Sequence, residues 1–243
     1  MVKPPGRLAA AVELMDLPGT DPGEQARALR DLARFNRLFG GTRVILSHLA
    51  SLLSPPRIAP TSPGGAPIRI LDVATGYGDI PRAIAQWARQ RGLPVEIEAL
   101  DHQERIAELA ARASADLPEI HVHVGDALNL PYPDRSFDVA LASQVLHHME
   151  GEDQGRLLSE LYRVARRAAL VSDLLRGRWP FAVTWAGVHL FSRSRLIRHD
   201  GPLSIRRGFL AGELMTMARE AGWRRATVSR HIFFRLVLVG RKD

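Results

Sequence analysis

The segment Ile70-Leu71-Asp72-Val73-Ala74-Thr75-Gly76-Tyr77-Gly78-Asp79 carries the strongest structural signal in the chain. The apolar run over 68–73 predicts a buried strand, and apolar residues at helical spacing follow over 80–91. The glycines between them let the backbone turn sharply and bring helix N–H groups close to a ligand. A tight strand–helix turn without a ligand would show the same pattern, so this segment alone fixes only local structure.

The same alternation continues on both sides of this segment. Strands are predicted at 68–73, 95–100, 120–124, 137–142 and 169–174, and helices at 80–91, 103–115 and 153–166. Near the end, a helix at 211–221 precedes two runs, 226–234 and 236–240, that are close enough to pair as an antiparallel hairpin. Strand–helix alternation of this kind predicts a doubly wound, Rossmann-like α/β fold with helices on both faces of the sheet.

The first part of the chain has a different pattern. Residues 1–54 read as a helical extension, with a start signal at Asp21-Pro22, a stop at Gly40-Gly41 and Thr42 as the cap of a second helix. Five prolines and two glycines make 55–67 a predicted linker. The predicted organisation is therefore an N-terminal helical cap over 1–54, the linker, and a main domain over 68–243 with an insertion at 176–210.

Acidic residues follow successive strands. Asp72 lies in the first strand, Asp101 ends the second, 23 residues after Gly78, and Asp126 ends the third. Ligands of such sheets bind outside the carboxyl ends of the strands, where an acidic side chain can accept hydrogen bonds from ribose hydroxyls. Each aspartate alone could serve a turn or a helix cap. Together they predict one nucleoside-binding crevice.

The run GDALNLPYPDRSFDVALASQVLHHM over 125–149 makes the pattern specific. The chain resembles class I S-adenosylmethionine-dependent methyltransferases, in particular the small-molecule group of the ubiquinone/menaquinone-biosynthesis type. The resemblance rests on motifs over 68–175 and continues to 243 by pattern only. It implies a seven-stranded sheet with an antiparallel last strand. A nicotinamide-dependent dehydrogenase would share the first loop and the ribose acid but would not be expected to show the motifs of 125–138.

The resemblance also implies roles for individual residues, with S-adenosylmethionine as cofactor and S-adenosylhomocysteine as product. The methionine end of the cofactor would lie against Asp72, Ala74, Thr75, Gly76, Tyr77 and Gly78. The nucleoside would lie against Asp101 (ribose), His102 (flanking the adenine), Asp126 (adenine amino group) and Ala127 (backbone N–H near the ring). Ser143 and Gln144 would lie near the sulfonium and the substrate.

One position departs from the family pattern. The family's loop usually begins with glycine where this chain has Ala74. Alanine does not tolerate a strongly positive φ, so we expect the loop to keep its shape with slightly less room for the carboxylate end of the cofactor.

Candidate catalytic residues are histidines, because methylation of a hydroxyl requires removal of its proton and histidine titrates near neutrality. His148 and His147 follow the fourth strand, and His199 precedes Asp200 in the insertion. For His199-Asp200, a plain turn before Gly201-Pro202 is the simpler interpretation. The pair Arg206-Arg207 could bind an acidic acceptor or simply be solvated. The aromatic stretch 179–191 is expected in the acceptor pocket wall or a homodimer contact.

Composition narrows the remaining classes. There is no cysteine among the 243 residues, which excludes disulfides and a thiolate nucleophile. We expect a cytoplasmic protein, since no signal peptide and no apolar run of membrane-spanning length is evident. The net charge of +7 comes mainly from dispersed arginines, so a nucleic-acid partner is not expected. An acidic residue typical of metal-dependent catechol enzymes is absent after the fourth strand, so no metal is predicted.

The sequence therefore predicts metal-independent methyl transfer to a small, apolar, aromatic or polyketide-like acceptor of secondary metabolism, with oxygen as the favoured target. Carbon methylation of a quinone-type ring stays open. So do an RNA or protein methyltransferase and a non-catalytic cofactor-binding protein.

Overall fold

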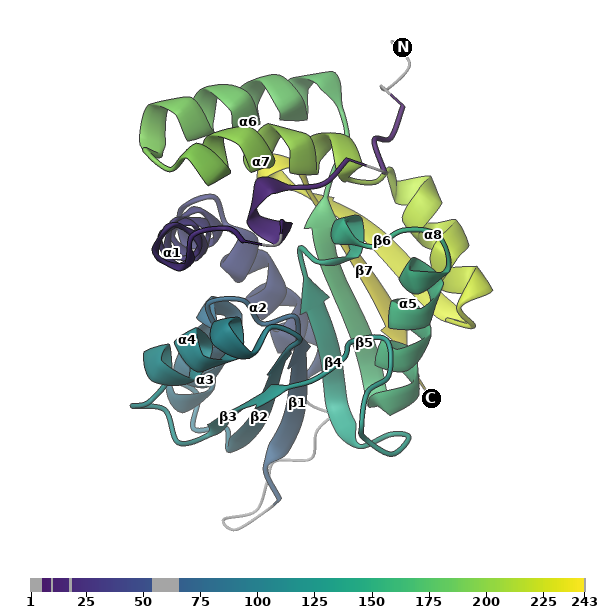
Figure 1. Cartoon of the computed structure of the whole chain (residues 1–243). Helices are drawn as coiled ribbons and strands as arrows, with labels where there is room; N and C mark the ends of the chain where they lie inside the picture. Colours follow the sequence, from purple (N-terminus) through teal and green to yellow (C-terminus); the bar gives the residue numbers. More distant parts are fainter. Residues whose placement is uncertain (1–5, 10, 18, 54–65, 243) are drawn as a thin grey trace.

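The computed structural model describes residues 6–9, 11–17, 19–53 and 66–242. Its centre is a seven-stranded sheet of order β3-β2-β1-β4-β5-β7-β6 (Figure 1). The strands are β1 (Ile68–Val73), β2 (Val95–Asp101), β3 (Ile120–Val124), β4 (Phe137–Ser143), β5 (Ala165–Leu174), β6 (Arg225–His231) and β7 (Arg235–Arg241). The first five strands are parallel, and β7 runs antiparallel between β5 and β6. The predicted fold class and antiparallel hairpin are confirmed.

Helices cover both faces of the sheet, as the strand–helix alternation predicts. The helices are α1 (Pro22–Leu38), α2 (Gly41–Leu52), α3 (Asp79–Arg89), α4 (Glu104–Ala113), α5 (Glu152–Val164), α6 (Arg178–Phe191), α7 (Arg195–Arg207) and α8 (Ala211–Glu220). Three short 3₁₀ turns are η1 (Leu14–Asp16), η2 (Leu146–His148) and η3 (Ile232–Phe234). Apolar side chains of α2 and α3 pack on one face, and those of α5 and α8 pack on the other. The strands β1, β4 and β5 are therefore buried from both sides, whereas most residues of the edge strand β3 are partly or fully exposed.

The N-terminal helices α1 and α2 have different kinds of N-cap. The Asp21 side chain accepts a hydrogen bond from the Glu24 N–H, and Pro22 follows it, as predicted for the start of α1. The prediction that Thr42 caps α2 is wrong. The helix begins two residues earlier, at Gly41, and its cap residue Gly40 takes a left-handed conformation (φ 75°) that only glycine adopts at little cost. Of the predicted linker, only residues 66 and 67 lie among the described residues.

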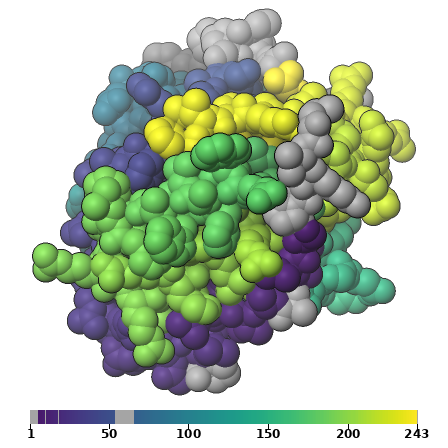
Figure 2. All heavy atoms as spheres, turned by 90° about the horizontal axis from the view of Figure 1, so that it is seen from above, coloured from purple at the N-terminus to yellow at the C-terminus, as the bar shows by residue number. Residues whose placement is uncertain are grey.

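The insertion at 176–210 forms α6 and α7, which lie over the carboxyl-end edge of the sheet. Seen from above in Figure 2, they lie between the N-terminal segment and the C-terminal strands. The turn considered for His199-Asp200 is wrong, since both residues lie inside α7, whose first turn is capped by the Ser194 side chain. No helix among the described residues has the length and apolar character needed to cross a membrane.

Candidate functional site

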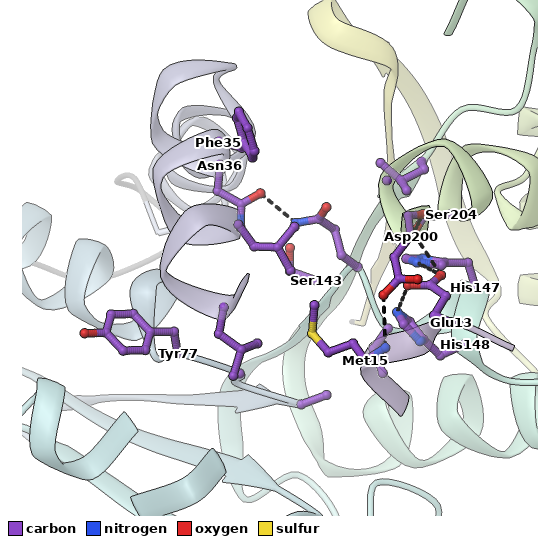
Figure 3. Close-up of a pocket in the computed structure, with 18 of the residues that line it drawn as sticks. Glu13, Met15, Phe35, Asn36, Tyr77, Ser143, His147, His148, Asp200 and Ser204 are labelled. Carbon is purple, nitrogen blue, oxygen red and sulfur yellow. Dashed lines mark hydrogen bonds and ion pairs between the residues drawn. The ribbon is translucent and has the colours of Figure 1, made fainter. Parts of the chain in front are cut away.

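A cavity of about 1000 Å³ lies at the carboxyl ends of the parallel strands. Its floor comes from β1, β2 and β4, and residues of α1, η1, α6 and α7 complete its walls. Figure 3 shows part of this lining. Most of the predicted site residues contribute to it: Asp72, Ala74, Thr75, Gly76, Tyr77, Asp101, His102, Asp126, Ala127, Ser143, Gln144, His147 and His148.

The loop after β1 is held in a tight left-handed conformation. Ala74, Gly76 and Gly78 have φ values of 56°, 57° and 69°. The loop is fixed to β2, since Thr75 N–H donates to the Leu100 carbonyl at 3.0 Å and Gly76 N–H donates to the Asp101 carboxylate at 3.0 Å. Ala74 thus takes a positive φ in spite of its Cβ. Sterically unfavourable backbone of this kind clusters at ligand sites.

Two predicted site residues do not line the cavity. A Cβ on Gly78 would lie 3.3 Å from Ala110 Cβ, so this glycine lets the loop pack closely against α4. His199 is half exposed, and its Nδ1 lies 2.8 Å from Asp200 Oδ1. Asp200 itself is buried and lines the cavity, where its carboxylate accepts the N–H groups of Leu14 and Met15 at 2.8 and 3.0 Å. The structure therefore gives Asp200 a role in anchoring η1.

Asp72 and Asp101 place two buried carboxyl groups on the cavity floor. Burial raises the pKa of Asp72 to about 8, although the Thr75 hydroxyl donates to it at 2.7 Å. Burial also raises the pKa of Asp101, against the opposing effect of the Gln103 and Gly76 N–H donors. Among the described residues, His102 lies beside Asp101 at 3.6 Å, but neither carboxyl has an arginine or lysine as a cationic partner that would offset its desolvation. A positively charged ligand in the cavity would supply one.

The nucleoside end of the predicted site is more exposed. Asp126 accepts a hydrogen bond from the Leu128 N–H at 2.8 Å, and Ala127 is buried beside it. His102 lies next to Asp101, with its Nδ1 3.6 Å from the carboxylate. These side chains come from the ends of β2 and β3, as the chain order predicts. A carboxylate at each of two strand ends can accept hydrogen bonds from the hydroxyl and amino groups of a nucleoside.

Gln144 connects the floor of the cavity to the N-terminal helices. It has a positive φ of 57°, and its amide donates to Asn36 Oδ1 at 2.6 Å. Asn36 also donates to Asp79 at 3.1 Å and accepts from Arg235 Nη2 at 2.8 Å. Asn36 and Arg235, which the sequence analysis did not single out, therefore belong to the site.

The other end of the cavity holds a buried polar cluster (Figure 3). His147 Nδ1 lies 2.7 Å from Asp173 Oδ1 at the end of β5, and His148 Nδ1 lies 2.7 Å from Asp16 Oδ2 in η1. Both Nε2 atoms face Glu13, at 3.6 Å from His147 and 3.8 Å from His148. In each imidazole, Nδ1 lies beside a carboxylate that orients the ring, and Nε2 is directed at Glu13.

Opposite charges in this cluster shift the pKa values of its members. Burial alone would lower the pKa of His148, but the hydrogen bond to Asp16 and the charge of Glu13 raise it to about 9. Burial alone would raise the pKa of Asp173, but His147 holds it below its usual value. His148 is therefore an imidazolium at neutral pH. Glu13, His147 and His148 also offer three ligand atoms within 4.8 Å of one another, a donor set suited to a transition-metal ion, so the metal-free reaction stays a prediction.

The arginine pair of the insertion divides between two environments. Arg207 is buried and donates to the His147 carbonyl at 3.0 Å and to the Ala11 carbonyl. Arg206 is exposed. A fully solvated pair is therefore the wrong interpretation, because Arg207 ties the N-terminal segment to η2.

Glu13 and Asp16 are functional candidates that the sequence analysis missed. They lie in an apolar stretch, Val12 to Leu17, where two acidic residues are a weak signal for buried partners. Their partners are more than 130 residues away in sequence, and no local pattern links them.

Comparison with known proteins adds the family. Residues 70–168 match the family described as methyltransferase domain. Demethylmenaquinone methyltransferase of Deinococcus radiodurans is 39% identical over 100 residues, which are 41% of this chain and 39% of that protein. Ajmaline N-methyltransferase of Rauvolfia serpentina is 31% identical over 140 residues, 54% of this chain and 46% of that protein. A SAM-dependent methyltransferase structure from Aquifex aeolicus has a TM-score of 0.61 at 16% identity, covering 91% of this chain and 98% of that one.

These similarities cover different shares of the chain. The matched region spans less than half the length of either curated relative. The structural similarity extends over most of the chain, and at 16% identity it shows a shared fold. The family match lies over β1 to β5, the part of the chain that builds the predicted donor site.

Proposed function

We propose that this chain, whose residues 70–168 form a class I S-adenosylmethionine-dependent methyltransferase domain, transfers a methyl group to a small, largely apolar acceptor. One observation carries the proposal: a single cavity has the motif residues of the donor at one end and, at the other, a chamber that combines apolar side chains with the cluster of His147 and His148. A volume of about 1000 Å³ is at the upper end of ligand pockets, which suits two small molecules side by side.

The donor would lie along the ends of β1, β2 and β3. Its ribose hydroxyls would bond to Asp101, and its adenine amino group to Asp126 with Ala127 beside the ring. Its ammonium and sulfonium charges would lie near Asp72, whose desolvated carboxyl lacks a cationic partner. The methionine end would follow the loop over 74–78, with Ser143 and Gln144 near the methyl group. When bound, the donor supplies the activated methyl group.

The acceptor would occupy the chamber beneath α1, α6 and α7. Transfer requires a nucleophile in line with the methyl–sulfur bond, about 3 Å from the carbon and shielded from water. For a hydroxyl acceptor, His147 is the better base of the two adjacent histidines. Asp173 orients its ring in the arrangement of a histidine–carboxylate pair. His148, an imidazolium at neutral pH, would instead pair with Asp16 and face Glu13.

Oxygen methylation is the reaction that such a base serves. Carbon and nitrogen are alternative target atoms, because one relative is a demethylmenaquinone methyltransferase and another is an N-methyltransferase of ajmaline. Carbon methylation of an activated quinone-type ring also needs a proton removed, so the same His147 could act there. The N-terminal segment over 1–54 would act as a cap on the acceptor chamber, because Glu13, Met15 and Phe35 line it.

The first experiment tests donor binding separately from methyl transfer. Thermal melting with S-adenosylhomocysteine and, separately, with NADH tests the cofactor class. A ligand at a hundredfold over its dissociation constant stabilises a protein by about 2.7 kcal/mol, a rise of roughly 5–10 °C for a domain of this size. A shift with S-adenosylhomocysteine alone supports the proposal, and a shift with NADH alone contradicts it. An acceptor panel with labelled donor, with and without EDTA, then tests methyl transfer and its independence of metal ions.

A further inference from the structure

Arg235 is a buried cation whose hydrogen bonds are incomplete. It is the first residue of β7, is 7% exposed and lines the cavity. Its Nη2 donates to Asn36 Oδ1 at 2.8 Å, but its Nη1 is buried without a hydrogen-bond partner. No carboxylate of the described residues forms an ion pair with it within 4.0 Å, although Asp173 and Asp79 act on it at longer range. A buried donor left without a partner is unfavourable, so such a group calls for an explanation.

The guanidinium packs against the start of α2. A Cβ on Gly41, the first residue of that helix, would lie 3.2 Å from Arg235 Nη2. The N-cap residue Gly40 has no side chain to accept the first N–H groups, and the first turn of α2 contains no acidic residue. A helix N-terminus carries a partial positive charge, which here lies beside the full charge of Arg235. Two positive groups are thus held together without a counter-charge in direct contact.

Three aromatic rings line the same cavity as the guanidinium. Phe35 and Phe39 stack with centroids 5.7 Å apart, and Phe233 meets Phe39 edge to face at 5.3 Å. All three rings line the cavity. Phe233 and Phe234, directly before Arg235, have φ values of 54° and 61°, a strained conformation for phenylalanine. The cavity that Arg235 lines therefore also has an aromatic wall.

We propose that Arg235 forms an anion site that holds a carboxylate carried by an aromatic acceptor. The inference deepens the proposed function and rests on it, because it assumes that the acceptor enters this cavity. The carboxylate would pair with the guanidinium and the aromatic body would lie against Phe35, Phe39 and Phe233. Arg235 begins β7, which lies next to β5, and it shares Asn36 Oδ1 with Gln144, the residue that would lie near the methyl group of the donor.

The wild-type protein provides the primary test. Benzoate and its neutral counterpart benzamide are titrated calorimetrically in the presence of saturating S-adenosylhomocysteine. We expect benzoate to bind at least tenfold more tightly than benzamide. Equal affinities would overturn the anion site while leaving methyl transfer untouched. If S-adenosylhomocysteine itself fails to bind, the proposed function fails first, so the two failures are distinguishable.

Variants then assign the preference to Arg235. Arg235→Gln should abolish the difference in affinity between benzoate and benzamide. Arg235→Lys should retain part of this difference, since lysine keeps the charge without the planar fork. Arg37→Gln is the matched control, because Arg37 is an exposed arginine of the neighbouring α1 and should leave the preference intact. A preference that survives in both Arg235 variants, each shown to be folded by circular dichroism, would overturn the assignment.

A carboxylate could also come from the methionine end of the donor. 5′-Methylthioadenosine lacks this amino-acid portion, so its affinity is compared with that of S-adenosylhomocysteine in the wild type and Arg235→Lys. We expect the ratio of the two affinities to stay constant. A selective loss of S-adenosylhomocysteine affinity, tenfold or more, would show that Arg235 holds the donor's carboxylate and would overturn the acceptor assignment.

Discussion

His147 and Asp173 form a buried pair that joins the turn after β4 to the end of β5. Their side chains approach to 2.7 Å, and Asp173 also accepts the backbone N–H groups of His147 and Leu174. Asp173 is 0% exposed, so solvent does not reach its carboxylate. The carboxylate therefore fixes both the position and the ring orientation of the histidine.

Replacing Asp173 with asparagine should lower kcat by about 100-fold or more with little change in donor affinity, because general-base catalysis contributes about 10²–10⁴-fold. The measurement is steady-state kinetics on an identified acceptor, paired with calorimetry of S-adenosylhomocysteine. His148→Gln is the comparison variant, with a smaller expected loss. A larger loss for His148→Gln than for Asp173→Asn would return the base role to His148.

Replacing Asp101 with alanine removes an acceptor of the predicted ribose contacts. Hydrogen bonds to a charged group contribute about 1.5–3 kcal/mol, so S-adenosylhomocysteine affinity should fall roughly 10- to 150-fold. Circular dichroism and melting report whether the fold survives the loss of the Gly76 and Gln103 contacts. Unchanged affinity in the folded variant would refute the assignment of the ribose site.

The pKa of Asp72 makes both stability and donor binding depend on pH. The folded-state pKa of about 8 lies above the unfolded value of ~3.9, so the folded protein binds the extra proton between these values. The free energy of unfolding should therefore fall as pH rises from about 4 to about 8 and then level off. Asp72→Asn should remove this contribution, which urea unfolding at pH 6 and pH 9 would measure. Asp126→Asn, an exposed site on the same cavity, is the control.

The same carboxyl should lose its proton when the cationic donor binds. At pH 7, calorimetry in phosphate and in Tris should give different apparent enthalpies, because the released proton is taken up by buffers of different ionisation enthalpy. The difference should shrink in Asp72→Asn. Identical enthalpies in both buffers for the wild type would contradict proton release at this site.

Ala74 offers a direct test of backbone strain. A left-handed conformation costs a non-glycine residue about 1–2 kcal/mol, and glycine recovers this at an entropic cost of about 0.5–1 kcal/mol. Ala74→Gly should therefore raise stability by up to about 1 kcal/mol, or Tm by roughly 2–4 °C. Ala111→Gly, on an exposed position of α4, should lower stability by a similar amount. A fall in Tm for Ala74→Gly matching that of Ala111→Gly would show that Ala74 is unstrained.

The parts of the fold that could be predicted are those whose signals are local. The strand β1, its glycine loop and Asp101 are predicted correctly because strand, turn and helix patterns occupy consecutive residues. The positive φ of Ala74 went unpredicted since the contacts that impose it come from β2, through Leu100 and Asp101.

The acceptor end of the cavity shows the opposite case. Glu13 meets His147 and Arg235 meets Asn36 only after the sheet has formed, over separations of 134 and 199 residues. Helical periodicity in α1 and α6 says nothing about which strand end they will cover. Long-range pairing of polar groups leaves no periodic trace in a single sequence, so this half of the site required the structure.

The position of β7 between β5 and β6 has a consequence for the order of assembly. The residues predicted to hold the donor lie between β1 and the turn after β4, so they all precede α5 in the chain. The acceptor end joins η1, which precedes α1, to Arg235 in β7, and it closes only when β7 is inserted beside β5. A folding intermediate without β7 in place would therefore carry the predicted donor residues beside an unfinished chamber.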